Sequence, residues 1–208
     1  MKKKIHIFNL GTGNIESVRN AVDFLGYKPV IIENLNLKKI DHLILPGVGH
    51  FKVIMDNIKK KNIYKQLNNL IDNQTVKVLG ICIGMQIFFS SSQEAVNTKG
   101  LNLFEKRLVN FSKSTKKFNL PIPHVGFSEV QHPETQLWSN FNKKEFFYFD
   151  HSFMVPCFKN KNNYKLGHTF YGQNFVSYIE YKNIIGCQFH PEKSQSNGLK
   201  FLNNFLSL

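Results

Sequence analysis

The chain has 208 residues, 42% of them hydrophobic, and its 27 Lys and Arg against 14 Asp and Glu give a formal net charge of +13. This length and apolar fraction exclude a disordered protein and favour one domain, which we expect over residues 1–208. The charge alone would suit a nucleic-acid partner. However, only Arg19 and Arg107 are arginines and no zinc-finger or aromatic RNA-binding signature occurs, so we expect no nucleic acid.

The first half of the sequence alternates strand and helix patterns in chain order. Its predicted strands are 5–10, 29–33, 42–45 and 76–81, and its predicted helices are 15–25, 51–71 (one or two) and 83–90. Such alternation is typical of an α/β fold with a mainly parallel central sheet flanked by helices.

The second half has a different pattern, with many strands separated by polar loops. Strands are predicted at 107–112, 128–131, 145–155, 165–170, 175–181 and 184–189, and a last helix at 198–206. We therefore expect an additional antiparallel sheet to join the parallel one.

The apolar segments of the sequence are too short for a membrane-spanning or secreted protein. The longest mainly apolar run, 78–89, is too short to span a membrane, and 5–10 is too short and polar for a signal-peptide core. Three cysteines are too few for a disulfide framework, so we expect a reducing compartment, the cytoplasm.

Cys82 lies in Gly80-Ile81-Cys82-Ile83-Gly84, between a predicted buried strand and a predicted helix. This pattern is typical of a nucleophile elbow, with cysteine in place of serine. A sharp turn pushes the sulfur out of the sheet, and the helix N-terminus beneath it favours the thiolate and leaves N–H groups free to hold an oxyanion. The alternative, a cysteine that is a small core residue, is less consistent with the two flanking glycines.

A base for this cysteine is predicted at His190, which ends an apolar strand and precedes Pro191-Glu192. In an extended chain, residues two apart point the same way, so Glu192 would hold the imidazole while His190 faces Cys82. The turn Pro46-Gly47-Val48-Gly49 lacks the residues of a phosphate-binding loop and would supply a second oxyanion donor. No cofactor is expected, and no His, Cys, Asp or Glu set has metal-ligand spacing.

Together these segments resemble the class I glutamine amidotransferases. The match runs through Gly80 to Gln86 and through Gln188-Phe189-His190-Pro191-Glu192-Lys193-Ser194. Within that family, four further segments resemble the glutaminase subunits of imidazole glycerol phosphate synthases: Gly13-Asn14-Ile15, Leu45 to Gly49, Pro123-His124-Val125-Gly126-Phe127 and Tyr148-Phe149-Asp150-His151-Ser152. The resemblance implies a flavodoxin-like fold.

The resemblance also implies a mechanism and site residues. Cys82 would attack glutamine and release ammonia, His190 would act as acid and base, and Glu192 would orient it. Backbone N–H groups near Val48 and Ile83 would hold the oxyanion. The glutamine would be held by Gly49, Gln86, His151, Ser152 and Phe153.

The implied partner is a (β/α)8-barrel cyclase subunit, bound as a heterodimer through a surface that includes Phe127, Tyr148 and Lys193. The ammonia would serve imidazole glycerol phosphate formation in histidine biosynthesis. Phe127 and Ser128 stand where the family usually has Trp and Asn, and Asp150 where it usually has an apolar residue. These departures leave the partner open, and the alternative is a glutaminase that feeds a sugar-modifying synthetase of surface-polysaccharide biosynthesis. A second alternative, an inactive interaction subunit, is less consistent with the intact Cys82, His190 and Glu192.

Overall fold

A computed structural model describes residues 2–11, 13–35, 39–60, 63–72, 76–111, 118–160 and 162–208. Five strands form its parallel part, in the order β2 (Lys28–Ile32), β1 (Lys4–Phe8), β3 (His42–Leu45), β4 (Lys77–Ile81) and β13 (Ile184–Cys187). Every residue of β3 and of β13 is buried, as expected of parallel strands that are covered on both faces. The mainly parallel sheet predicted from the sequence is confirmed.

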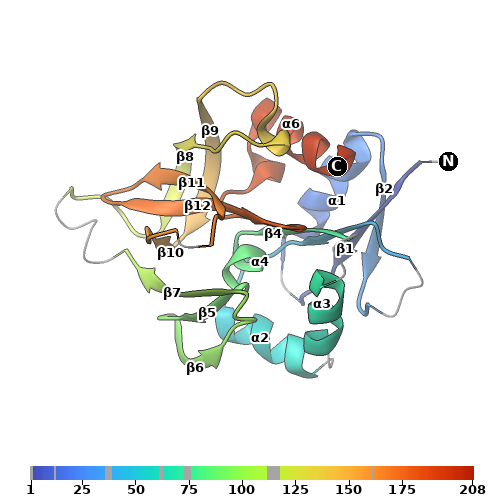
Figure 1. Ribbon diagram of the computed structural model, residues 1–208, viewed down its shortest axis with the longest axis horizontal. Helices are drawn as coiled ribbons and strands as arrows, with labels where there is room; N and C mark the ends of the chain where they lie inside the picture. The colour runs from blue at the N-terminus through green and yellow to red at the C-terminus, as the bar shows by residue number, and fades with distance from the viewer. Residues whose placement is uncertain are drawn as a thin grey trace.

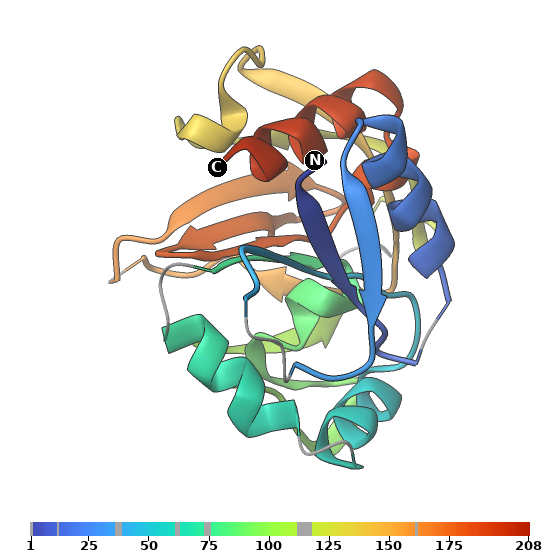
Figure 2. The same ribbon diagram turned by 90° about the vertical axis from the view of Figure 1, so that its right-hand side faces the viewer.

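Helices cover both faces of this parallel part (Figures 1 and 2). On one face lie α1 (Ile15–Phe24) and α6 (Gln195–Ser207), and on the other lie α2 (Phe51–Lys60) and α3 (Ile63–Asp72). The buried residues of α2 are spaced three and four apart, so one stripe of the helix faces the core: Phe51, Ile54, Met55 and Ile58. Two separate apolar clusters result, one on each face of the sheet.

The second part of the sheet joins the parallel part at β13. The strand β12 (Asn174–Tyr181) pairs with β13 and is followed in the sheet by β10 (Phe153–Pro156), β7 (Phe104–Asn110), β5 (Phe89–Ser92) and β6 (Ala95–Lys99). A branch from β12 carries β11 (Lys165–Phe170), β8 (His124–Gln131) and β9 (Lys144–His151). Every strand pair of this second part except β5–β7 is antiparallel. Among the described residues, no helix combines the length and the apolar character needed to cross a membrane.

Several predicted boundaries in the middle of the chain are wrong. The predicted helix 83–90 is only a four-residue helix, α4 (Ile83–Gln86), and is followed by strand β5. Its apolar residues are buried on all sides, and periodicity does not separate a short buried helix from a buried strand. The hairpin strand β6 was not predicted, and the predicted strand 145–155 is two strands, β9 and β10, separated at Ser152. Residue 112 of the predicted strand 107–112 lies outside the described residues.

The carboxyl ends of β1, β3, β4 and β13 meet at one edge of the sheet because these strands are parallel. The segments that follow them are 9–14, 46–50, Cys82 with α4, and 188–194 with the short 3-10 helix η2 (Pro191–Lys193). Ligands of open α/β sheets bind at this edge. The fold therefore gathers the Gly-rich turn 46–49, Cys82 and His190 at one edge of the sheet.

We expect Gly84→Ala to lower the free energy of unfolding by about 2 to 3 kcal/mol, because the new methyl group overpacks a rigid site. A Cβ atom at Gly84 would lie 1.9 Å from the backbone oxygen of Leu45. Urea denaturation followed by circular dichroism measures the change. Gly13→Ala is the matched control, since its Cβ would meet nothing nearer than Val48 Cγ2 at 3.6 Å. A midpoint for Gly84→Ala equal to that of Gly13→Ala would contradict this account of the turn.

Candidate active site

Cys82 occupies a sharp turn between β4 and α4, with φ 51° and ψ −107°. Positive φ is uncommon for a residue with a side chain and costs free energy that the surroundings must supply. The Cys82 N–H donates to the Cys187 carbonyl (2.8 Å), and the Cys82 carbonyl accepts from the Gln86 N–H (3.0 Å). A Cβ at Gly80 would lie 2.5 Å from the Gly84 oxygen, so the turn needs glycine there as well. This is the elbow that the sequence pattern predicted.

The side chains of His190 and Glu192 are fully buried beside this turn. Glu192 Oε1 lies 2.8 Å from His190 Nδ1 and accepts a second hydrogen bond from Asn14 Nδ2 at 2.5 Å. The predicted extended chain through Pro191 is wrong, because Pro191–Lys193 forms the 3-10 turn η2. The two side chains meet nonetheless, since His190 itself is extended and the turn brings Glu192 back beneath its ring.

The charge state of His190 is set by its neighbours. Burial lowers the pKa of the imidazole, but electrostatic attraction to Cys82 and the bond to Glu192 outweigh burial and raise the pKa to about 10. Glu192 occupies Nδ1. The site therefore holds an imidazolium whose second ring nitrogen, Nε2, interacts with Cys82.

A cavity of about 250 Å³ opens onto the sulfur. Each predicted oxyanion and substrate-binding residue lines it: Val48, Gly49, Ile83, Gln86, His151, Ser152 and Phe153. It is smaller than the ~300–1,000 Å³ typical of pockets for drug-sized ligands. The cavity is therefore suited to a molecule of amino-acid size.

Two buried amides connect the cavity wall to the sulfur. Gln86 Nε2 donates to the Phe153 carbonyl (3.1 Å) and to Gln188 Oε1 (3.0 Å). Gln188 Nε2 in turn lies 3.5 Å from Cys82 Sγ, within reach of a hydrogen bond to sulfur. The sulfur therefore faces an N–H donor.

Three residues at the site were not among those predicted. Asn14 contacts Glu192, Gln188 contacts Cys82, and Glu94 lines the cavity while its carboxylate accepts from the Phe51 N–H at the start of α2 (2.7 Å). Asn14 and Gln188 lie within motifs that the sequence analysis singled out, but nothing local shows which atoms they meet. Glu94 lies between β5 and β6, beyond the predicted helix 83–90 and outside every predicted element, so no sequence signal pointed to it.

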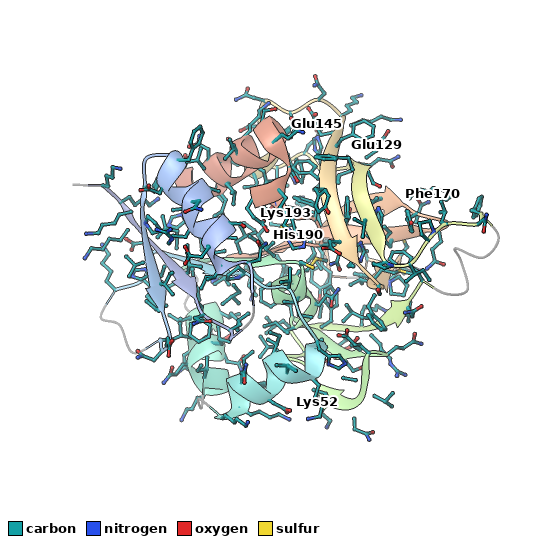
Figure 3. The ribbon with its side chains drawn as sticks, turned by 180° about the vertical axis from the view of Figure 1, so that it is seen from behind. Lys52, Glu129, Glu145, Phe170, His190 and Lys193 are labelled. Atoms are coloured by element: carbon teal, nitrogen blue, oxygen red, sulfur yellow. The ribbon has the colours of Figure 1, made fainter. Side chains whose placement is uncertain are left out.

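The predicted interface residues lie together, with Phe127 on β8, Tyr148 on β9 and Lys193 in η2. The rings of Phe127 and Tyr148 are 5.7 Å apart, and Lys193 Nζ lies 5.6 Å from the centre of the Tyr148 ring. Figure 3 shows Lys193 beside His190, where α1 and α6 approach β8 and β9. Phe127 is 47% exposed, so an aromatic surface adjoins the site.

The other cysteines are set apart from this chemistry. Cys157 is exposed, Cys187 is buried behind the elbow, and burial raises the pKa of both thiols. Within the described ranges, His, Cys, Asp and Glu side chains form no group of three or more that could hold a metal ion. Cys82 is thus the cysteine that combines a cavity, a cation and an N–H donor.

Comparison with known proteins agrees with this geometry. Residues 6–208 match the family model of class-I glutamine amidotransferases. "Imidazole glycerol phosphate synthase subunit HisH" of Buchnera aphidicola subsp. Schizaphis graminum is 38% identical over 209 residues, covering 98% of this chain and 99% of the relative. The protein of the same name from Sulfurimonas denitrificans is 37% identical over 202 residues, covering 97% and 96%.

A solved structure described as a glutamine amidotransferase has the same fold. It superposes with a TM-score of 0.75 over 98% of this chain and 97% of its own, at 13% identity. The family model and the two sequence relatives each span nearly the whole chain. The chain therefore belongs to the class-I glutamine amidotransferase family.

Proposed function

We propose that this chain is a glutaminase subunit that hydrolyses glutamine to glutamate and ammonia at Cys82 and passes the ammonia to a (β/α)8-barrel cyclase for imidazole glycerol phosphate formation. The observation that carries the reaction is the strained Cys82 turn beside the charged His190, both at a cavity of amino-acid size. The names of the two sequence relatives support the place of the reaction in histidine biosynthesis. We further propose that residues 1–208 act as one domain in the cytoplasm.

The reaction follows from the charges at the site. The Cys82 thiolate attacks the side-chain carbonyl carbon of glutamine, and the oxyanion forms near the Val48 and Ile83 backbone. The His190 imidazolium gives its Nε2 proton to the amide nitrogen, so ammonia leaves and a thioester remains. Water then attacks the thioester while His190 takes its proton, and glutamate leaves as the thiolate re-forms.

The cavity supplies groups for the amino-acid end of glutamine. Glu94 places a carboxylate in its wall, suited to the α-ammonium group. Gly49 and the 151–153 segment contribute backbone polar groups on other sides of the cavity. Gln86 holds the Phe153 carbonyl, so the wall is fixed before substrate enters.

A glutamine analogue with an electrophilic side chain should label Cys82 alone, because only this cysteine lies beside a cation within a substrate-sized cavity. Peptide mass spectrometry of the labelled protein identifies the modified residue. Cys82→Ala should abolish both labelling and ammonia release, and His190→Ala should lower kcat about 10² to 10⁴-fold. Labelling of the exposed Cys157 instead would show that the nucleophile has been misassigned.

Glu192→Gln should lower kcat by about tenfold, less than His190→Ala, because a neutral amide keeps one hydrogen bond but loses the charge. The charge of Glu192 helps to raise the pKa of His190, so its removal lowers that pKa. The imidazolium is then lost at lower pH, and the alkaline limb of the kcat–pH profile should move toward neutral pH. An unmoved alkaline limb would mean that Glu192 does not set the charge of His190.

The cyclase partner is tested by ammonia release, measured alone and with the organism's own cyclase plus its ribotide substrate. We expect strong stimulation by the cyclase. Lys193→Ala and Phe127→Ala should weaken the complex about tenfold or more, since buried aromatic and cationic groups dominate interfaces. Phe170→Ala is the control, because Phe170 is also an exposed phenylalanine but lies away from Lys193 (Figure 3).

Other outcomes of that measurement identify the alternatives. Asp150 is paired in register with Val125 near the end of β9, and it lines the cavity. It lies in a segment that is expected to meet the partner. This position favours a partner with a cation there, and activity that the cyclase leaves unchanged would direct the search to sugar-modifying synthetases. Absence of ammonia release under every condition would favour an inactive interaction subunit.

A further inference from the structure

Two histidines are buried at the cavity, His151 in its wall and His124 behind that wall, and the reaction steps described above give neither imidazole a role. His124 on β8 is paired in register with His151 on β9, and His124 Nδ1 lies 3.1 Å from His151 Nε2. The His124 ring is stacked between Phe149 and Tyr171, with ring centres 4.7 and 3.9 Å away. Stacking of this kind holds the ring in one plane, so its nitrogens have fixed partners.

The partners determine where each proton lies. The Phe153 carbonyl only accepts hydrogen bonds, so the proton of His151 is on Nδ1, 2.8 Å away. A neutral His151 then has a lone pair on Nε2 and accepts from the N–H at Nδ1 of His124. His124 Nε2 is therefore an acceptor as well, and the hydroxyl of Ser128, 2.8 Å away, donates to it. The chain of donors runs in one direction from Ser128 to Phe153.

Both rings are neutral, as this pattern requires. Burial lowers the pKa of His124 to about 4 and that of His151 to about 3, and repulsion from His124 and His190 lowers the latter further. The titratable groups around them are His190 on the Cys82 side, the Tyr171 phenol on the stacked face, and Glu94 and Asp150, which line the same cavity as His151. A neutral pair beside the cationic His190 avoids a second buried positive charge.

The Phe153 carbonyl joins this chain to the sulfur. It also accepts from Gln86 Nε2, and that bond fixes which way the Gln86 amide points. The Gln86 N–H groups then face Gln188 Oε1, so Gln188 Nε2 points to Cys82 Sγ. If Gln188 were reversed, its amide oxygen would face the sulfur and repel a thiolate.

We propose that Ser128, His124 and His151 are positioning residues: a hydrogen-bonded relay that fixes the Phe153 carbonyl and, through it, the Gln86 and Gln188 amides for glutamine binding at Cys82. This inference rests on the proposed glutaminase function. Ser128 and His124 touch neither the cavity nor the sulfur, so they act only through His151. The relay differs from ordinary core packing because it depends on proton positions and not on shape.

Glutamine affinity tests the relay with turnover blocked. Calorimetry on the full chain carrying Cys82→Ser, which keeps an acceptor for Gln188, measures the Kd for glutamine. Ser128→Ala removes the first donor, and His124→Phe keeps a stacked ring but removes both nitrogens. Each should weaken binding about tenfold, as expected for loss of a buried hydrogen bond. Ser128→Thr keeps the hydroxyl and should restore the Kd to within about twofold of the parent.

The outcomes separate the two proposals. Binding that is unchanged by both Ser128→Ala and His124→Phe overturns the relay and leaves the glutaminase proposal standing. If Ser128→Ala and Ser128→Thr weaken glutamine binding equally, the relay is also overturned. Equal effects would mean that the position responds to a change of shape and not to the loss of the hydroxyl group. If the Cys82→Ser protein binds no glutamine, the proposed function fails, and the role of the relay fails with it.

Proton positions are measured directly by ¹⁵N NMR of the imidazole rings in the intact wild-type protein. His124 and His151 should both carry their proton on Nδ1, and neither ring should titrate between about pH 5.5 and 8.5, well above both depressed pKa values. In Ser128→Ala the proton of His124 should no longer be confined to Nδ1, whereas in Ser128→Thr it should stay on Nδ1. A proton on Nε2 of either ring, or titration in that range, overturns the relay whatever the activity.

Discussion

The backbone turn at Cys82 is the constraint on which the rest of the site depends. The positive φ of Cys82 brings α4 so close to β3 and β4 that Gly80 and Gly84 have no room for a side chain. The N–H of Cys82 is taken by the Cys187 carbonyl, so the turn also fixes the register of β13. β13 leads directly to His190. The pairing of β4 with β13 that holds the strained Cys82 turn therefore also places His190, the base, beside Cys82.

Histidines in this small region are held in opposite charge states by what surrounds them. His190 and His151 are both deeply buried, and burial alone would make each neutral. Cys82 and Glu192 overcome burial at His190, whereas His151 faces a carbonyl oxygen and another imidazole. The site can therefore provide a proton donor at His190 and a fixed hydrogen-bond pattern at His151, and neither ring has to move.

Patterns that are local in the chain were readable from the sequence, and contacts between distant segments were not. The strands 42–45 and 165–170 were predicted with the observed bounds, and the elbow was found from two glycines and a cysteine. The β5–β6 hairpin was missed because its serines and short length resemble a loop after a helix. Asn14 meets Glu192 across 178 residues of chain and Gln188 meets Cys82 across 106, so neither bond leaves a local signal.

The place of β13 in the sheet has a consequence for how the protein is made on the ribosome. This strand lies between β4 and β12, yet it follows both in the chain. From the emergence of β4 until that of β13, on the order of ten seconds at ~5–20 residues per second, the nascent sheet has an unpaired edge beside an apolar face. During that interval the unpaired edge leaves the growing chain open to aggregation.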